Sequence, residues 1–301
     1  MRKQYIKIIP IVIIKTFITC LLITLTFFCI FHNDSFIFSF KRTLYLWLYK
    51  VIPSIFTFYV IINILIYLNI LDKILIIFKP LRFIFRFESN IAFNLFIISI
   101  FTGNPSAASL IYHNYQNNTI SKSDYEKLIL SSGFVTPLFI ISLFNNDLKK
   151  SFIILLSHIL SYFFTCIVIT INNKNINICK NNKSYTNKQN ITSIFYNAVT
   201  ISLTIASIMV FVNLIITSLI ELKVAKNLLL FFELSCGITM ILENNFTLLT
   251  LPIISFLLSF NGLCLHLQVF SQITDVSYGK FFFFRLLQGL LSATISYFIL
   301  L

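Results

Sequence analysis

Long apolar stretches, separated by short polar segments, make up most of the chain. They extend over residues 10–31, 44–70, 90–115, 128–144, 151–171, 196–220, 227–242, 246–270 and 281–301. A helix needs about 20 apolar residues to cross a bilayer, and some of these stretches are too short or too interrupted to cross fully. Lipid offers the backbone no hydrogen-bond partner, so the crossing segments must be helices. The pattern predicts an all-α, polytopic integral membrane helical bundle.

Composition and charge support a membrane protein. Hydrophobic residues make up 57% of the chain and charged residues 11%, whereas an ordinary soluble domain carries about 25% charged residues. The formal net charge of +13 would fit a nucleic-acid partner. However, the Lys and Arg residues lie in short loops and at the ends of apolar stretches, where they set the orientation of helices. We therefore expect the lipid bilayer, and no nucleic acid, as a partner.

The first apolar stretch is not expected to be removed as a signal peptide. The chain begins MRKQYIKIIP, as a signal peptide does, but the apolar stretch is too long and lacks a small-residue cleavage site. We expect a retained transmembrane helix.

The six cysteines are scattered, mostly inside apolar stretches, without CxxC or paired spacing. They are expected to be buried apolar residues, with no metal and no cofactor.

Clusters of basic residues predict how the chain is oriented. Those near the N-terminus place it in the cytoplasm, and those within 72–87 mark a cytoplasmic amphipathic segment at the membrane surface. The Asn/Lys-rich segment 172–195 is expected to be a flexible cytoplasmic linker. An even number of crossings must separate two cytoplasmic segments, but three apolar stretches lie between them. We expect residues 90–115 not to cross.

Weak internal similarity indicates a repeat. SIFTF at Ser54 recurs as SIMVF at Ser207, and FTG at Phe101 recurs as FNG at Phe260, with two further pairs in the same order at a similar offset. The two copies would enter the membrane from opposite sides. An inverted repeat with broken or re-entrant helices is the sequence sign of a binding site near the middle of the membrane. The expected organisation is an N-terminal transmembrane helix and short loop (1–43), a first repeat half (44–171), the linker (172–195) and a second repeat half (196–301).

Glycine and proline mark where the helices are expected to break. Only six glycines occur in the chain, and two of them, Gly103 and Gly133, shortly precede Pro105 and Pro137. Such combinations interrupt helices. One interpretation is a kink or an ordinary turn. The other is an unwound segment that lines a cavity, because the polar residues beside Gly103 would otherwise face lipid.

These residues also resemble a known family. The segment FTGNPSAASLIYHNYQNNTISKSDYEKLILSSGFVTPLFII is similar to the central motif of the sporulation integral membrane protein YlbJ family, which is related to the nucleoside-recognition "Gate" domain proteins. Further matches are WLYKVIPSIFTF, FELSCGI and SFNGLCLHLQVFS, so the resemblance extends from about residue 44 to the end of the chain. The motif positions are Gly103, Asn104, Pro105, Ala107, Ala108, Ser121 and Pro137 to Ile140.

The resemblance implies a multi-pass cell-membrane protein of an endospore-forming bacterium, in the mother-cell or forespore membrane. It implies a role in spore development, with transport of a small polar solute and other sporulation membrane proteins as partners. This chain departs from the family pattern in three places: Asn104 replaces an aromatic residue, Ser106-Ala107 stands where Gly-Ala is common, and Ser132-Gly133 replaces an Asn-rich pair.

Glu233 is the main candidate for a functional side chain. It is the only carboxylate deep inside an apolar stretch, four residues before Gly237. An ionisable group inside a membrane is costly and is usually functional, although a structural hydrogen bond between helices is the alternative. We expect Glu233 to hold a cation, a proton or a substrate amine or hydroxyl. A change between its charged and neutral forms would couple protons to movement.

Polar residues at the two breaks complete the expected binding site. The expected substrate-binding residues are Glu233, Gly103, Asn104, Pro105, Ser106, Asn261, Gly262, His266 and Gln268. His266 and Gln268 are equally consistent with polar contacts between packed helices. His158 is expected to be a packing residue with its hydrogen bonds satisfied. Asp124, Glu126 and Lys127 are expected on a solvated helix face or as an i,i+3 pair.

Three functional hypotheses are compatible with the sequence. The chain holds no HExxH, GxSxG or glycine-rich phosphate loop, so we do not expect an enzyme, and an intramembrane hydrolase is the weakest of the three. A transporter used during sporulation is the first hypothesis, and it requires polar groups that converge near the middle of the membrane. A non-transporting scaffold for spore assembly is the second, with residues 72–87 and the linker as its docking surfaces.

Overall fold

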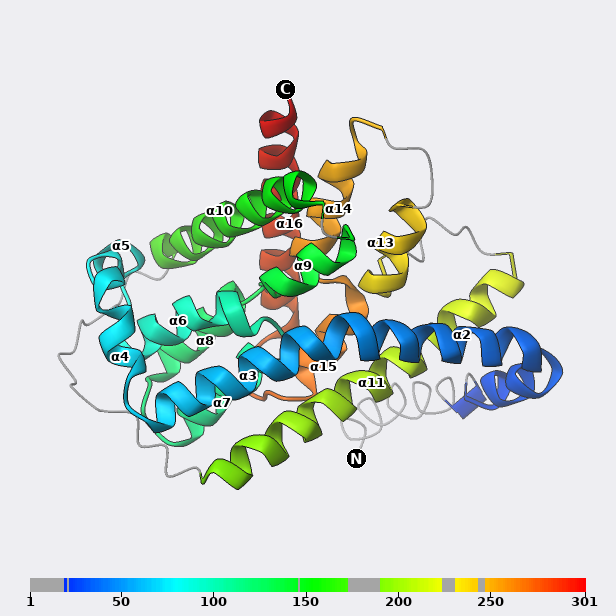
Figure 1. Cartoon of the computed structure of the whole chain (residues 1–301), viewed down its shortest axis with the longest axis horizontal. Helices are drawn as coiled ribbons and strands as arrows, with labels where there is room; N and C mark the ends of the chain where they lie inside the picture. Colours follow the sequence, from blue (N-terminus) through cyan, green and yellow to red (C-terminus); the bar gives the residue numbers. More distant parts are fainter. Residues whose placement is uncertain (1–18, 21, 146, 173–189, 224–230, 243–246) are drawn as a thin grey trace, which may run out of the picture.

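The computed structural model describes residues 19, 20, 22–145, 147–172, 190–223, 231–242 and 247–301. The first part of the expected N-terminal transmembrane helix and most of the 172–195 linker therefore lie outside the described residues, whereas Leu22–Phe31 forms an apolar helix. Every regular element within them is a helix (Figure 1). The expectation of an all-α fold is confirmed.

The helices follow one another along the chain with short connections. In order, they are α2 (Asn33–Leu46), a π-helical turn η1 (Trp47–Val51), α3 (Ile52–Tyr67), α4 (Leu71–Ile74), a 3-10 turn η2 (Leu75–Phe78), α5 (Leu81–Phe85), α6 (Asn90–Thr102), α7 (Ser106–Gln116), α8 (Lys122–Ser131), α9 (Pro137–Leu143), α10 (Leu148–Asn172), α11 (Ile191–Glu221), α13 (Leu234–Leu242), α14 (Thr250–Phe260), α15 (Gly262–Phe270) and α16 (Tyr278–Leu300).

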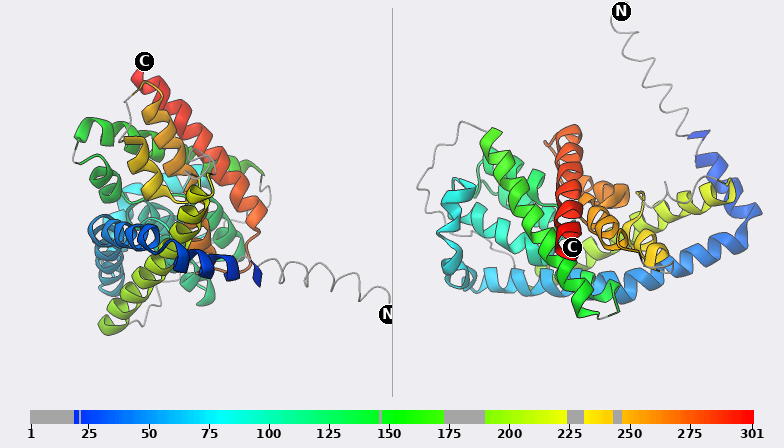
Figure 2. Two further views of the ribbon diagram at one scale, coloured as in Figure 1. Left: turned by 90° about the vertical axis from the view of Figure 1, so that its right-hand side faces the viewer. Right: turned by 90° about the horizontal axis from the view of Figure 1, so that it is seen from above.

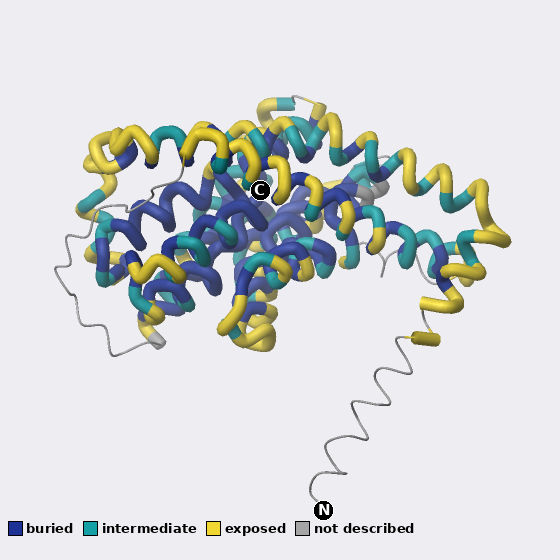
Figure 3. Tube along the Cα trace, turned by 90° about the horizontal axis from the view of Figure 1, so that it is seen from below, coloured by how far each residue is buried: buried dark blue, intermediate teal, exposed yellow. Residues whose placement is uncertain are grey.

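Five of the described helices are long and apolar enough to cross a membrane. They cover Asn33–Tyr67, Leu148–Ile171, Ile191–Glu221, Thr250–Phe270 and Tyr278–Leu300. Many of their large apolar side chains are exposed on the outside of the molecule, whereas buried residues gather along the inner faces of the helices (Figure 3). Apolar surface of this extent on long helices indicates a multi-pass membrane protein.

The helix that contains most of the stretch 44–70 begins earlier than the pattern predicted and ends at Tyr67. A short loop was expected before residue 44, but α2 starts at Asn33 and continues through η1 into α3 without a break. Asp34 lies in the first turn of α2, where the positive end of the helix dipole stabilises a negatively charged carboxylate. Because Lys41 and Arg42 interrupt the apolar pattern, the helical continuity was not visible in the sequence.

The stretch 90–115 is not a single long helix. It divides into α6 and α7 at Gly103–Pro105, and α6 is too short to be among the five long apolar helices. The stretch 246–270 likewise divides into α14 and α15 at Asn261. Residues 132–136 separate α8 from α9. The breaks expected at glycine, asparagine and proline therefore interrupt the helices in the structure.

Two helices run side by side through the molecule in opposite directions. The continuous helix α2–η1–α3 and the long helix α11 lie antiparallel (Figure 1). The packed core lies beside them, where α16 contacts α10 and α14 (Figure 2). One buried apolar cluster is formed mainly by α6, α8 and α10, and a second by α3, α11 and α14.

Candidate functional site

The backbone of the non-helical segment 132–136 holds the first break, at Gly103–Pro105, in place. Gly103 has φ +61°, and a Cβ there would lie 2.7 Å from Cγ2 of Thr136 and 2.9 Å from its backbone nitrogen. Only glycine fits this approach without strain. The backbone N–H of Asn104 donates to Phe134 O at 2.9 Å, and its side-chain Nδ2 donates to Ser132 O. The Gly103 break and the non-helical segment 132–136 therefore form one unit.

His158 joins this unit to the second half of the chain. The N–H of Val135 donates to His158 Nε2 at 3.0 Å, and Nδ1 lies 2.6 Å from Ser259 Oγ. Because Nε2 accepts from a backbone donor, the proton of the neutral ring is on Nδ1 and is donated to Ser259. The expectation that His158 is a packing residue with satisfied hydrogen bonds is confirmed. Its ring connects α10 both to the 132–136 segment and to the end of α14.

The second break has a similar construction. Asn261 and Gly262 both have positive φ, +75° and +54°. Past the break, the N–H groups of Leu263 and Cys264 donate to Phe231 O at 2.8 Å and to Phe232 O at 2.7 Å. These bonds satisfy donors at the start of α15, which have no partner within the helix. They also hold the segment that leads directly into Glu233.

Glu233 is fixed at the start of α13. Its Oε1 accepts from the backbone N–H of Ser235 at 3.0 Å, as an N-cap side chain does. The N-terminus of a helix favours a negative charge. The side chain is 3% exposed. This geometry keeps a carboxylate inside the protein while part of its charge is balanced by the helix.

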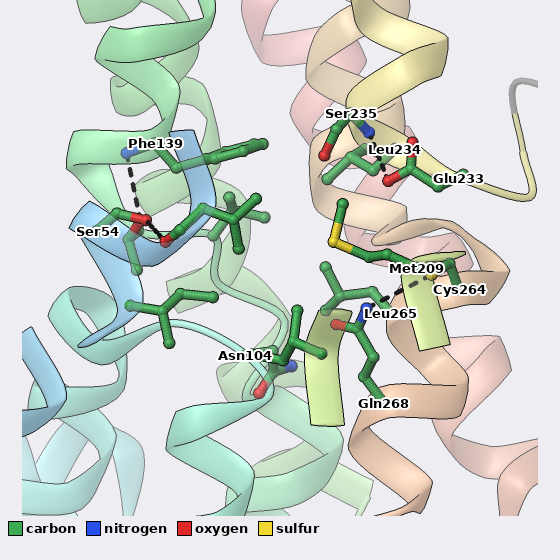
Figure 4. A pocket seen from close by; sticks show the side chains of 15 residues that line it. Ser54, Asn104, Phe139, Met209, Glu233, Leu234, Ser235, Cys264, Leu265 and Gln268 are labelled. Carbon is green, nitrogen blue, oxygen red and sulfur yellow. Dashed lines mark hydrogen bonds between the residues drawn. The ribbon is translucent and has the colours of Figure 1, made fainter. Parts of the chain in front are cut away.

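A small cavity lies between the two breaks. Its polar lining includes Asn104 from the first break, Glu233 and Ser235 from the start of α13, Gln268 from α15 and Ser54 from α3 (Figure 4). The rest of the lining is mainly apolar. The cavity has a volume of about 40 Å³, which is room for about three water molecules. We call it the central cavity.

The side chains in this cavity have hydrogen-bonding capacity to spare. Asn104 is 4% exposed, and its Oδ1 has no hydrogen-bond partner among the described residues. Gln268 Nε2 donates to Cys264 Sγ at 3.4 Å, and sulfur is a weak acceptor. A buried acceptor without a partner costs about 1–3 kcal/mol. The polar side chains that line the cavity are therefore one carboxylate, two amides and three hydroxyls, which could bind a small polar guest or water.

The structure brings together three of the nine expected binding residues. Asn104, Glu233 and Gln268 line the central cavity, whereas the other six do not. These six are Gly103, Pro105, Ser106, Asn261, Gly262 and His266. Gly103 and Gly262 shape the breaks. His266 Nε2 lies 2.9 Å from Phe260 O, and its ring lines a separate apolar cleft.

Two buried side chains at the breaks have unused polar atoms. Asn261 is fully buried, and neither atom of its amide has a hydrogen-bond partner in the described part of the chain. The same is true of the Ser106 hydroxyl. Neither residue lines the central cavity in this state.

Of the two alternatives expected for Asp124 and Lys127, the solvated helix face is wrong, whereas the i,i+3 pair is supported because the charge of Lys127 acts on Asp124. Both side chains are buried, 1% and 2% exposed, and neither belongs to a solvated face. Asp124 accepts from the backbone N–H groups of Glu88 and Ser89 at 3.1 and 3.2 Å. Lys127 Nζ donates to Phe85 O and, at 3.3 Å, to Arg86 O. These backbone groups, distant in sequence, compensate the burial of both charges.

Arg285 was not among the expected residues, although it is fully buried in α16. Its Nη1 donates to Gln288 Oε1 at 2.5 Å, and its Nη2 donates to Leu130 O near the end of α8. Gln288 Nε2 donates to Gly133 O at 3.4 Å. Arg285 therefore holds the backbone where α8 unwinds. The signal in the sequence was an arginine inside the apolar stretch FFFFRLLQG.

The described residues contain no group of three or more His, Cys, Asp or Glu side chains that could hold a metal ion. Comparison of the chain with protein-family models, curated proteins and solved structures finds no match.

Proposed function

We propose that this chain is a membrane transporter of a small polar solute and that the central cavity is its binding site. The observation that carries the proposal is the convergence of Asn104, Glu233 and Gln268 on one cavity between two interrupted helices. A single buried polar residue is common between packed helices. Polar side chains from three separate elements around one cavity are the arrangement that a transporter requires.

The proposal includes an inverted repeat. Residues 44–171 and 196–301 would be two halves of opposite orientation, and the breaks at Gly103–Pro105 and Asn261–Gly262 would be their corresponding re-entrant points. Support comes from the positive φ of Gly103, Asn261 and Gly262, and from the hydrogen bonds that tie each break to a neighbouring non-helical segment. The resemblance to the YlbJ family supports endospore formation as the setting.

The size of the central cavity indicates which state the structure represents. About 40 Å³ accommodates a proton, an ion or about three waters, but no larger solute. The structure is then a closed state, and the helices around the cavity would separate to admit the solute. In the proposed cycle, Glu233 binds the solute or a coupling proton while the cavity is closed to water.

Replacement of Glu233 by Gln tests this function. The change keeps the shape of the side chain and removes its charge, so spore formation is expected to fail while the protein still reaches the membrane. The matched control is Glu126→Gln, because Glu126 is a partly exposed carboxylate that lines none of the described cavities. Full spore formation by a Glu233→Gln variant at normal membrane levels would show that Glu233 is structural.

A scaffold for spore assembly is the second candidate. It is favoured by the exposed apolar side chains of the basic segment 72–87, where Ile77 is 80% and Phe83 is 71% exposed. A scaffold would require this surface and would tolerate the loss of Glu233. Replacement of Ile77 and Phe83 by Ser separates the two functions, because a transporter with an intact cavity would keep its activity if it remains in the membrane.

A further inference from the structure

Three cavities lie in sequence along the antiparallel pair formed by α2–η1–α3 and α11. The pairing is defined by hydrogen bonds from Ser35 Oγ to Glu221 Oε1 at 2.7 Å and from Thr217 Oγ1 to Ser39 Oγ at 2.7 Å. Further along, Trp47 Nε1 donates to Ser202 O at 3.0 Å. We call this pair of helices the seam.

The first cavity is a cleft of about 430 Å³ at one end of the seam. We call it the Glu221 cleft. Its lining is rich in polar groups from both helices, including Asp34, Arg42, Asn213 and Glu221. Such groups are compatible with a water-filled entrance and unfavourable against lipid.

The second cavity along the seam is the central cavity. The seam contributes Val51, Ser54 and Ile55 from one side and Ile205 and Met209 from α11. In Figure 4, Ser54 lies across the cavity from Glu233 and Gln268, whereas Met209 lies on their side. Both helices of the seam therefore contribute to the lining of the proposed binding site.

The third cavity is a cleft of about 340 Å³ at the other end of the seam. We call it the Asn197 cleft. It is lined by Tyr59 from α3, by Asn197 and Thr200 from α11, and by His113 and Gln116 from α7. Its lining is rich in polar groups, as is that of the Glu221 cleft at the other end of the seam.

Only about one helical turn separates the cavities on α11. Met209 lines the central cavity and Asn213 lines the Glu221 cleft, whereas Ile205 lines the central cavity and Ile201 lines the Asn197 cleft. Each pair is four residues apart, a rise of about 6 Å along a helix. On α3, Ile55 and Tyr59 repeat the same step.

The residues that close the central cavity are apolar and tightly packed. On the side of the Glu221 cleft, the central cavity is lined by Met209 and Val51, which are 3% and 6% exposed. Ile55 and Ile205 separate it from the Asn197 cleft and are 8% and 2% exposed. A thin apolar constriction between two polar compartments excludes water and ions until it widens.

We propose that the seam is the access route to the central cavity, with the Glu221 and Asn197 clefts as its two mouths. Met209 closes the route on the Glu221 side, and Ile205 closes it on the Asn197 side. The route rests on the proposed function, because it gives the central site access from both faces of the membrane. Alternate movement of these two closures would expose the site to one face at a time.

A native thiol allows the route to be tested. Cys264 lines the central cavity and is 2% exposed. We would replace the other five cysteines by Ser and measure the modification of Cys264 by a small, membrane-impermeant, cationic methanethiosulfonate reagent. The reagent would be added to one face of inside-out or right-side-out vesicles. A variant that keeps only Cys166 is the matched control, since Cys166 is fully buried in α10 and lines none of the described cavities.

The substitutions Met209→Ala and Ile205→Ala are expected to open opposite faces. Each removes most of an apolar closure, so the rate of Cys264 modification should rise at least about tenfold from one face only. The face should differ between the two variants. Ile154→Ala controls for a general loss of packing, because Ile154 is buried in the same apolar cluster but lines none of the described cavities. It should leave the rate unchanged.

Several outcomes would overturn the route. One is a rate that neither substitution alters, including the absence of any modification. Another is faster modification from the same face, or from both faces, in both variants. The test is independent of the Glu233→Gln experiment. If Cys264 is modified from one face in each variant and Glu233→Gln still forms spores fully, the route is retained and Glu233 is rejected as its functional group. If neither substitution gives face-specific modification of Cys264 and Glu233→Gln fails to form spores, only the route is rejected.

Discussion

Arg285 occupies the space that a side chain at residue 133 would need. A Cβ on Gly133 would overlap Nη1 and Cζ of Arg285 and would lie 2.6 Å from Oε1 of Gln288. The guanidinium group is fully buried, and two of its nitrogens donate hydrogen bonds to Gln288 and to Leu130 O. The absence of a side chain at residue 133 therefore allows α16 to hold the unwound end of α8.

Substitution of Gly133 by Ala is expected to destabilise the protein. The new methyl group would displace Arg285, and such overpacking costs about 1–3 kcal/mol or more when a buried charge loses its partners. Gly279→Ala is the matched control, because a Cβ there has its nearest neighbour at 4.0 Å. It should leave stability unchanged or raise it by about 0.5–1 kcal/mol, since Gly279 is helical. Thermal unfolding in detergent measures both, and equal midpoints for the two variants would contradict the expectation.

Replacement of His158 by Ala is expected to destabilise the contact between the two halves of the chain. The N–H of Val135 would lose its acceptor and Ser259 its donor. An unsatisfied buried polar group costs about 1–3 kcal/mol. Ser259→Ala removes only one of the two bonds and should cost less. A double-mutant cycle in unfolding experiments measures the coupling, and strict additivity of the two substitutions would show that the bond contributes nothing.

Asp124 predicts a dependence of stability on pH. Burial raises the pKa of its carboxyl group from 3.8 to about 6, and the nearby Glu88 also raises it, while the hydrogen bonds from Glu88 and Ser89 and the charge of Lys127 lower it. Between pH 3.8 and about 6 the folded protein holds this proton and the unfolded chain does not. The contribution of Asp124 is therefore fully present below pH 3.8 and is lost as the pH rises through about 6.

The expected size of this effect is up to about 3 kcal/mol, because one pKa unit corresponds to about 1.4 kcal/mol. Asp124→Asn keeps the shape of the side chain and does not titrate. The unfolding midpoints of wild type and Asp124→Asn would be measured from pH 3 to 8 in one detergent. As the pH rises, the midpoint of the variant should increase relative to that of wild type. A difference that does not vary with pH would rule out titration of Asp124 as its source.

The helices and the two main breaks could be predicted from the sequence because the responsible signals are local. Apolar stretches of sufficient length form helices, and Gly103 and Asn261 adopt the positive φ that these residue types tolerate best. Glu233 was predictable as a cavity residue for a similar reason. It is a carboxylate in an apolar stretch, and such a group must be compensated within the protein.

The contacts of Asp124, Lys127 and Arg285 could not be predicted, because their partners are distant in sequence and mostly belong to the backbone. Lys127 finds its acceptor at Phe85, 42 residues earlier. Arg285 finds one at Leu130, 155 residues earlier. A helix end exposes carbonyl groups whatever its side chains are, so the sequence carries no mark of which charged residue will bind them.

The bridge at His158 has a mechanical consequence. Its ring is bonded on one edge to the segment 132–136 and on the other to α14, in a region where water is not available to replace either bond. His158 and Val135 both belong to the first half, so a translation of one half past the other would break the bond to Ser259 and keep the bond to Val135. A rotation about the imidazole would preserve both bonds, so relative motion of the two halves is expected to pivot at His158.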